Sequence, residues 1–263
     1  MNSISQKNNT KNLLWTGGWD STFTLMILFE EGVTVQPYYI IDKQRLSCKI
    51  EIKKMDAIRV AIKDKYPSKW GLMLPTIYID MEDIKIDESI YKKYQNISKY
   101  NALGSQYIWL ASYAKNSGIE GLQLSVQRRL KDVDSIIIPL LGDHINKNND
   151  NTTLPYWEIV DVTDDMDISI FQYFHFPILE YTKLDMLQIS KEKGFFDILN
   201  LSWFCHKPIH NKPCGICNPC KTAIEEGLSE RLPSEAIRRY RYKTIYYCYF
   251  KITKKLQNIL CRD

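Results

Sequence analysis

The sequence predicts an α/β fold with a doubly wound, mostly parallel sheet. Three observations support this fold. An apolar run at Leu13–Trp15 breaks into two glycines and opens a helix, short apolar runs then alternate with helical patterns, and four cysteines crowd into positions 205 to 220. We expect the cysteines to form a zinc knuckle beside the sheet, and the basic C-terminal segment to be a helical extension.

The first elements form one crossover. Leu13–Trp15 reads as a buried strand, Asp20–Phe29 as the helix that follows, and Val33–Ile41 as a second, fully buried strand. Gly32 marks the end of the helix. A strand, a helix and a strand within about 30 residues form a right-handed parallel crossover.

The same alternation continues along the chain. We expect a helix at Ser47–Tyr66, a strand at Leu72–Ile79, a helix at Gly104–Ser117 and strands at Gly121–Val126 and Phe174–Ile178. Met81–Ser98 gives little signal, and Asn146–Thr153 reads as a loop. The segment Thr182–Gly194 is a clear helix, because Thr182 and Asp185 have the spacing of a capping box and Gly194 ends the pattern.

Length and composition favour a globular protein of the cytoplasm. The 263 residues are 44% hydrophobic, which is enough for a large core. The longest apolar runs, such as Val35–Ile41, are far shorter than the roughly 18 residues of a membrane span. Seven cysteines, an odd number, suit metal ligation in a reducing compartment better than disulfides.

We expect three regions: residues 1–10 as a disordered leader, 11–230 as the nucleotide-binding domain with the knuckle at 205–220, and 231–263 as a basic, aromatic-rich helical tail. The tail holds nine Lys/Arg against two acidic residues, a net charge of +7, which leaves −3 for the rest. Aromatic residues at helical spacing usually pack, so a docking or homodimer helix is preferred to a nucleic-acid contact for the tail.

The turn at Thr16–Thr22 predicts an anion site. Gly17 and Gly18 let the backbone approach a ligand, free N–H groups point out of the first helical turn, and Thr16, Ser21 and Thr22 add hydroxyl groups. A turn in which the glycines serve only to reverse the chain is the open alternative.

The same seven residues, Thr16-Gly17-Gly18-Trp19-Asp20-Ser21-Thr22, resemble the pyrophosphate loop of the ATP-pyrophosphatase (PP-loop) families, Ser-Gly-Gly-x-Asp-Ser. Threonine replaces the first serine and keeps its hydroxyl. The resemblance implies an adenine-nucleotide α-hydrolase-like fold and cleavage of ATP between the α- and β-phosphates. The chain has no Gly-x-x-x-x-Gly-Lys-Ser/Thr loop, which argues against cleavage at the γ-phosphate.

The cysteines Cys205, Cys214, Cys217 and Cys220 have the spacing C-x8-C-x2-C-x2-C. Four thiolates that converge across tight turns satisfy tetrahedral Zn²⁺ with no open position. An iron–sulfur cluster is the alternative, because four cysteines also hold such clusters. His206 and His210 lie within the same stretch and are expected to be surface residues.

A second resemblance adds detail. Pro177, Lys183 and Asp185, followed by the cysteine pattern, are similar to the C-terminal half of the 7-cyano-7-deazaguanine synthase family. The segment Asp42–Arg45 resembles that family's Asp-Tyr-Gly-Gln-Arg, one residue shorter. The resemblance touches residues 12 to about 228 and is loose in the middle.

The family converts 7-carboxy-7-deazaguanine and ammonia into a nitrile at the expense of ATP. The resemblance implies Asp20, Ser21 and Lys183 as catalytic residues and Asp20 as a Mg²⁺ ligand. It also implies nucleotide contacts from Thr16–Thr22, Ile41, Asp42 and Lys183. From spacing alone, Lys183 reads instead as an ordinary exposed lysine.

The departures lie where the acceptor would rest. The family has an arginine–asparagine pair where this chain has Gly104-Ser105-Gln106, and an Asp-Tyr-Ser-Gly-Tyr segment where it has Gln127-Arg128-Arg129. An arginine can hold a carboxylate, so Gln127, Arg128 and Arg129 are candidate substrate residues, with a solvated loop pair as the alternative. Two other functions stay open: a PP-loop enzyme with another acceptor, such as RNA, and a non-catalytic ATP-binding or assembly protein.

Overall fold

The structure is a computed structural model that describes residues 10–128, 137–148 and 154–242. The chain divides into two compact units. Unit 1 comprises residues 1–44 and 51–203, and unit 2 comprises residues 45–50 and 204–263. In the described ranges, no helix is long and apolar enough to cross a bilayer.

Unit 1 contains a mostly parallel sheet of seven strands in the order β3-β2-β1-β4-β7-β6-β5, counted within the described residues. The strands are β1 (Thr10–Leu14), β2 (Thr34–Ile41), β3 (Ile77–Asp80), β4 (Leu122–Gln123), β5 (Ile145–Asn148), β6 (Tyr156–Ile159) and β7 (Phe174–Phe176). The pairs from β3 across to β7 are parallel, whereas β7–β6 and β6–β5 are antiparallel. The predicted α/β class with a mostly parallel sheet is therefore confirmed.

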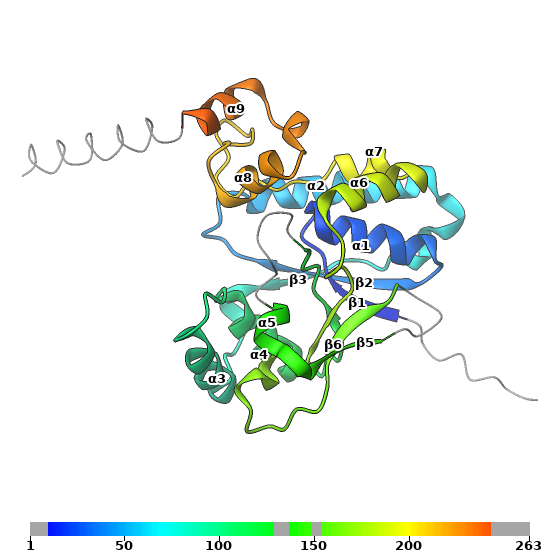
Figure 1. Cartoon of the computed structure of the whole chain (residues 1–263). Helices are drawn as coiled ribbons and strands as arrows, with labels where there is room; N and C mark the ends of the chain where they lie inside the picture. Colours follow the sequence, from blue (N-terminus) through cyan, green and yellow to red (C-terminus); the bar gives the residue numbers. More distant parts are fainter. Residues whose placement is uncertain (1–9, 129–136, 149–153, 243–263) are drawn as a thin grey trace, which may run out of the picture. The chain divides into compact units, whose positions relative to one another are not determined.

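Helices lie on both sides of this sheet. In Figure 1, α1, α6 and α7 lie on one side of it, whereas α3 and α4 lie on the other. Unit 1 holds α1 (Trp19–Glu30), most of α2 (Cys48–Lys65), α3 (Glu88–Ser98), α4 (Gln106–Asn116), α5 (Ile137–Leu141), α6 (Lys183–Glu192) and α7 (Phe196–Asn200). Unit 2 holds α8 (Asn218–Glu225) and α9 (Ser234–Arg241).

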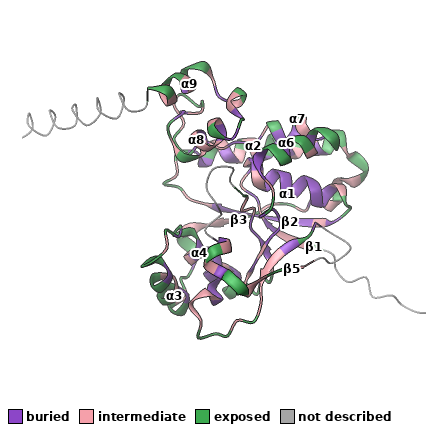
Figure 2. Ribbon diagram, viewed as in Figure 1, coloured by how far each residue is buried: buried purple, intermediate pink, exposed green. Residues whose placement is uncertain are grey.

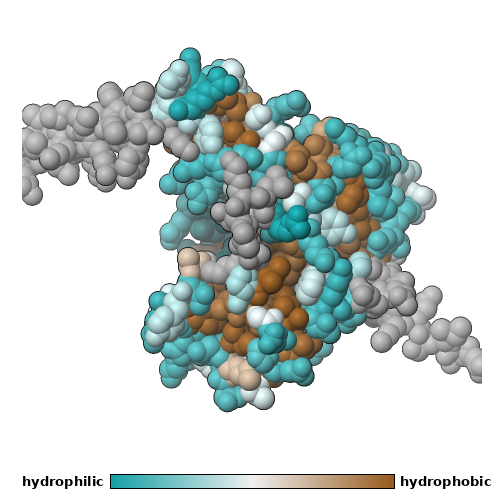
Figure 3. Space-filling view, viewed as in Figure 1, coloured by the Kyte–Doolittle hydropathy of each residue, from teal (hydrophilic) through white to brown (hydrophobic). Residues whose placement is uncertain are grey.

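The helix that follows β1 is almost wholly buried, as the continuous purple of α1 in Figure 2 shows. Its apolar residues run on without a polar stripe, and Phe23, Leu25 and Met26 have no exposed surface. A second hydrophobic cluster joins β2, β4 and β7 to α3, α4 and α5. In the face drawn in Figure 3, hydrophobic residues gather over α4 and α5, where that cluster approaches the surface.

Several predicted boundaries differ from the structure. The predicted strand Leu72–Ile79 starts later, at Ile77, because Pro75 has no N–H to donate to β2 and residues 67–72 form a 3₁₀ helix. The predicted loop Asn146–Thr153 is wrong over its first residues, which belong to β5. The segment Met81–Ser98, whose sequence pattern predicts no element, contains α3. The N-cap of this helix, Asp87, accepts hydrogen bonds from Ser89 N–H and Ile90 N–H.

The predicted outer regions are described only in part. The expected leader 1–10 ends in Thr10, which begins β1, and residues 1–9 lie outside the described residues. The expected helical tail 231–263 begins with α9, and residues 243–263 lie outside the described residues. The knuckle, which was expected inside a single 11–230 domain, belongs to unit 2.

Candidate functional site

The loop between β1 and α1 has the backbone geometry of an anion-binding turn. Gly17 is in the left-handed region at φ 63°, and Gly18 is the N-cap of α1 with no side-chain cap hydrogen bond. The hydroxyl of Ser21, three residues into the helix, instead accepts a hydrogen bond from Thr16 N–H at 3.2 Å. The start of α1 therefore offers its positive end to a ligand without competition from a capping side chain.

Two distant segments of unit 1 fix this turn. The Gly17 carbonyl accepts a hydrogen bond from Trp203 N–H at 2.8 Å. A Cβ at Gly17 would lie 2.7 Å from Met55 Cγ of α2, so the absence of a side chain is needed on steric grounds as well as for φ. Sequence reasoning missed Met55 and Trp203, because a backbone hydrogen bond and a methionine contact leave no motif.

The predicted catalytic residues Asp20 and Lys183 meet. Lys183 Nζ donates to Asp20 Oδ1 at 2.7 Å, from the first residue of α6 to the second residue of α1. The predicted capping box is confirmed, since Thr182 and Asp185 exchange hydrogen bonds and start α6 at this position. Lys183 is only 8% exposed, so its interpretation as an ordinary exposed lysine is wrong.

The neighbouring strand ends hold the other predicted nucleotide and substrate residues. Ile41 ends β2, and Asp42 Oδ1 accepts a hydrogen bond from Gln44 N–H at 2.9 Å, which turns the chain. After β4, the Arg128 N–H donates to the Tyr181 carbonyl at 3.0 Å, two residues before Lys183. Arg128 is exposed and Gln127 half-buried, whereas Arg129 lies outside the described residues.

A partly buried polar contact links α1 to the loop after β4. Thr24 Oγ1 and Ser125 Oγ lie 2.9 Å apart, and Thr24 also donates to the Asp20 carbonyl. These contacts hold the first two turns of α1 at the carboxyl edge of β1 and β4. In parallel sheets this edge is where ligands bind. The geometry can present backbone donors, hydroxyls, one lysine and one carboxylate to a charged ligand.

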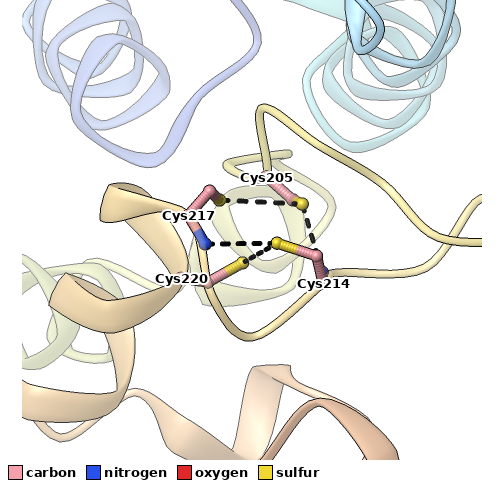
Figure 4. A group of neighbouring side chains, drawn as sticks. All are labelled: Cys205, Cys214, Cys217 and Cys220. Atoms are coloured by element: carbon pink, nitrogen blue, oxygen red, sulfur yellow. Dashed lines mark hydrogen bonds between the residues drawn. The ribbon is translucent and has the colours of Figure 1, made fainter. Parts of the chain in front are cut away.

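The four cysteines of unit 2 converge (Figure 4). Their sulfur atoms all lie within 4.8 Å of one another, and both the Cys214–Cys220 and the Cys217–Cys205 sulfur pairs are 3.9 Å apart. A tetrahedral ion with Zn–S distances of about 2.3 Å requires sulfur separations of roughly 3.8 Å. The residues therefore fit a four-coordinate metal, and the cysteine cluster predicted from spacing is confirmed as a group that could hold one.

Backbone donors support the sulfurs. Cys214 N–H donates to Cys205 Sγ at 3.2 Å, and the N–H groups of Ile216 and Cys217 donate to Cys214 Sγ. Hydrogen bonding within the cluster, from Cys205 first, lowers the pKa of Cys214 and Cys217, whereas hydrogen bonding from their cysteine neighbours raises the pKa of Cys205 and Cys220. Two of the four sulfurs are thus favoured as thiolates, which is the form that binds metal.

The histidines beside the cysteines lie outside the sulfur group. Both His206 and His210 are exposed, as the sequence predicted, and His210 has a positive φ of 49° in the loop between Cys205 and Cys214. The described residues thus offer four sulfur ligands without a nitrogen ligand.

Comparison with models of known protein families and with curated proteins finds no match to this chain.

Proposed function

We propose that this chain is an ATP-pyrophosphatase-type ligase, built on a doubly wound fold, that adenylates a carboxylate or amide and releases pyrophosphate. The observation that carries the proposal is the 2.7 Å pair of Lys183 and Asp20 beside the uncapped start of α1. The resemblance of Thr16–Thr22 to a pyrophosphate loop supports the same chemistry. Both support a polyphosphate site, because a cation, a carboxylate and backbone donors are the groups that bind a phosphate and its metal ion.

The roles follow from the chemistry of each group. The N–H groups at the start of α1 and the hydroxyls of Thr16 and Ser21 would bind the phosphate that leaves. Thr22 has no such role, because its side chain has no exposed surface and its hydroxyl accepts a hydrogen bond from Trp15 Nε1 at 3.2 Å. Lys183 would compensate negative charge on the nucleotide, and Asp20 would hold Mg²⁺, which neutralises phosphate charge when bound. Ile41 and Asp42 would contact the nucleotide from the end of β2.

The acceptor is proposed to be a small planar acid of the 7-carboxy-7-deazaguanine kind, with ammonia as the nitrogen donor. The support is the resemblance at Pro177, Lys183, Asp185 and the cysteines. Gln127 and Arg128 follow β4 at the ligand-binding edge, and the exposed Arg128 guanidinium could pair with a carboxylate. The middle segments depart from the family, so an acid of another shape is the second candidate.

Pyrophosphate release tests the proposal. The chain is incubated with ATP, Mg²⁺, ammonia and 7-carboxy-7-deazaguanine, beside other acids and a control without acceptor. Release that requires 7-carboxy-7-deazaguanine and ends in a nitrile supports the full proposal, and release with another acid supports the second candidate. ADP and phosphate as products would refute it, and ATP binding without release under any condition would favour the assembly-protein function.

We propose further that the sulfur cluster holds a structural Zn²⁺. Support comes from sulfur separations of 3.9 Å and from four sulfurs that leave no open position. Metal analysis and the absorption spectrum of the purified chain test this proposal. One equivalent of zinc without a visible band is expected, whereas iron with sulfide would identify a cluster instead.

A further inference from the structure

The loop that carries Cys214 is covered by α9 within unit 2. Arg239 of α9 donates from Nε to the Cys214 carbonyl at 2.7 Å and from Nη2 to the Pro213 carbonyl at 3.4 Å. One guanidinium thus holds two consecutive carbonyl groups. One of these carbonyl groups belongs to Cys214, a candidate metal ligand. Arg239 therefore holds the backbone from which the Cys214 side chain projects.

The backbone of the cysteine loop also packs directly against the backbone of α9. Gly215 has φ 80°, and a Cβ there would lie 2.0 Å from the Ala236 carbonyl oxygen of α9. Ala236 itself has no exposed surface. The residue between Cys214 and Ile216 must therefore be glycine for two separate reasons: its left-handed conformation and the close approach of α9.

The same helix is tied to the element that carries the fourth cysteine. Tyr240 O–H of α9 donates to Glu225 Oε1 of α8 at 2.7 Å, and Cys220 lies in the first turn of α8. The helix α9 therefore spans both arms of the sulfur cluster. A Zn²⁺ bound by four thiolates would carry a net charge of −2, and the single positive charge of Arg239, whose guanidinium donates to the Cys214 carbonyl, would offset part of it.

We propose that Arg239 is a positioning residue of the metal centre, and that metal occupancy and the docking of α9 are thermodynamically linked. The inference rests on the zinc site proposed above. Arg239 fixes the Pro213–Gly215 loop in the conformation that turns Cys214 Sγ toward its partners. Linkage is reciprocal, so a docked α9 tightens metal binding and bound metal stabilises the docked α9.

The first experiment measures zinc transfer from the full chain to an excess of a coloured chelator. Arg239→Ala is compared with Arg239→Lys and with Arg238→Ala, which removes an exposed arginine of the same helix. Arg239→Ala is expected to weaken zinc retention about tenfold, because a charge-assisted hydrogen bond is lost. Arg239→Lys should recover part of the loss, and Arg238→Ala should retain zinc as the unmodified chain does.

Cobalt spectroscopy excludes simple misfolding. Co²⁺-loaded Arg239→Ala should keep the intense bands of a tetrahedral four-thiolate site, because no ligand is removed. The reciprocal arm uses hydrogen exchange, in which the amides of α9 should exchange more slowly in the zinc-loaded chain than in the metal-free chain, and this difference should shrink in Arg239→Ala.

The outcomes separate the two proposals. If the unmodified chain retains no zinc or cobalt, both the metal site and the role of α9 are wrong. If the unmodified chain retains zinc and Arg239→Ala retains it equally well, the metal site stands and the role of Arg239 is overturned. Exchange in α9 that is the same with and without zinc would overturn the linkage.

Discussion

Lys183 Nζ lies 2.7 Å from Asp20 Oδ1, although the two residues are 163 positions apart in the chain. The lysine is 8% exposed and is the first residue of α6, directly after the N-cap of a capping box, so the start of the helix positions it. The contact joins the two helices that flank the β1 turn. The proposed nucleotide site depends on this pair, and the pair can be tested without any ligand.

A double-mutant cycle on Asp20 and Lys183 should give a coupling free energy of about 1–3 kcal/mol, as expected for a partly buried, charge-assisted hydrogen bond. Asp20→Asn, Lys183→Met and the double variant are compared by urea unfolding. Asp20→Asn should also weaken binding of Mg²⁺–ATP. Additive losses in stability would contradict the interaction, and unchanged nucleotide binding would contradict the role of Asp20.

Gly17→Ala should cost more stability than Gly32→Ala. Both glycines have positive φ, at 63° and 77°, but only a Cβ at Gly17 meets a neighbour, Met55 Cγ at 2.7 Å. The backbone strain of about 1 kcal/mol is therefore common to both, and the excess at Gly17 measures the steric contact. Because Met55 is itself fully buried and its truncation is costly, Gly17→Ala is also made in a Met55→Ala background, where it should cost less than in the unmodified chain. Thermal unfolding of the four variants measures the difference. Equal losses for the two glycines would refute the steric argument.

If the proposed zinc is bound, Cys217→Ala should abolish its binding and destabilise unit 2. Structural zinc contributes on the order of 10 kcal/mol to folding, and three sulfurs leave one position open. The matched control is Cys48→Ala, which removes a buried cysteine outside the sulfur group and should keep one equivalent of metal. Metal analysis with hydrogen exchange checks both. A Cys217→Ala chain with full metal content would contradict the assignment.

The pair of Asp87 and Lys115 should make stability fall at acid pH. Lys115 donates to Asp87 at 2.6 Å and, with the N–H groups at the start of α3, lowers the pKa of Asp87 from 3.8 to about 2. Because the folded-state pKa is depressed, the stabilisation is present above pH 3.8 and is lost as the pH falls toward 2. The pair is partly exposed, so its contribution stays below about 1 kcal/mol.

Asp87→Asn should therefore flatten the stability profile between pH 4 and pH 2 by a small amount, whereas Asp64→Asn, an exposed site on α2, should leave it unchanged. Urea unfolding at a series of pH values measures both. A profile for Asp87→Asn as steep as that of the unmodified chain would refute the shift.

Gln123→Met should stabilise unit 1 by about 1 kcal/mol, since an unsatisfied buried amide carries a desolvation cost. Gln123 has no exposed surface, and within the described residues neither its amide nitrogen nor its amide oxygen has a hydrogen-bond partner. The control is Gln36→Met, which should lower the free energy of unfolding, because the Gln36 amide donates to the Pro75 carbonyl at 2.8 Å and this hydrogen bond would be lost. A loss of stability in Gln123→Met would mean that the amide is satisfied in solution.

The features that could be predicted from the sequence are those determined by a few neighbouring residues. The β1 turn needs glycine at a positive φ, the α6 start needs a capping box, and the cysteine spacing needs only short turns, so each leaves a pattern within a few residues. The burial of Lys183 could not be predicted, because it depends on where α6 packs. The strand β5 was missed because Asn146, Lys147 and Asn148 have low strand propensity, and pairing with β6 overrides it.

The contacts that support the two candidate sites could not be predicted from the sequence, for a related reason. Trp203 contacts the β1 turn through its backbone N–H, and Arg239 contacts Cys214 through a carbonyl group. Every residue has the same backbone carbonyl group, so a contact made through the backbone does not restrict which amino acid stands at that position. They follow from the path of the chain, which spacing does not record.

The two-residue strand β4 is the only link in the described sheet between the β3-β2-β1 half and the β7-β6-β5 half. One half comes from residues 10–80 and the other from residues 145–176, and β4 joins them through Leu13, Phe174 and His175. The chain must therefore close a long loop before the sheet is continuous, which makes folding slow and non-local. During synthesis, β1 therefore keeps one edge unpaired until β4 has emerged, and β4 in turn keeps its far edge unpaired until β7 has followed.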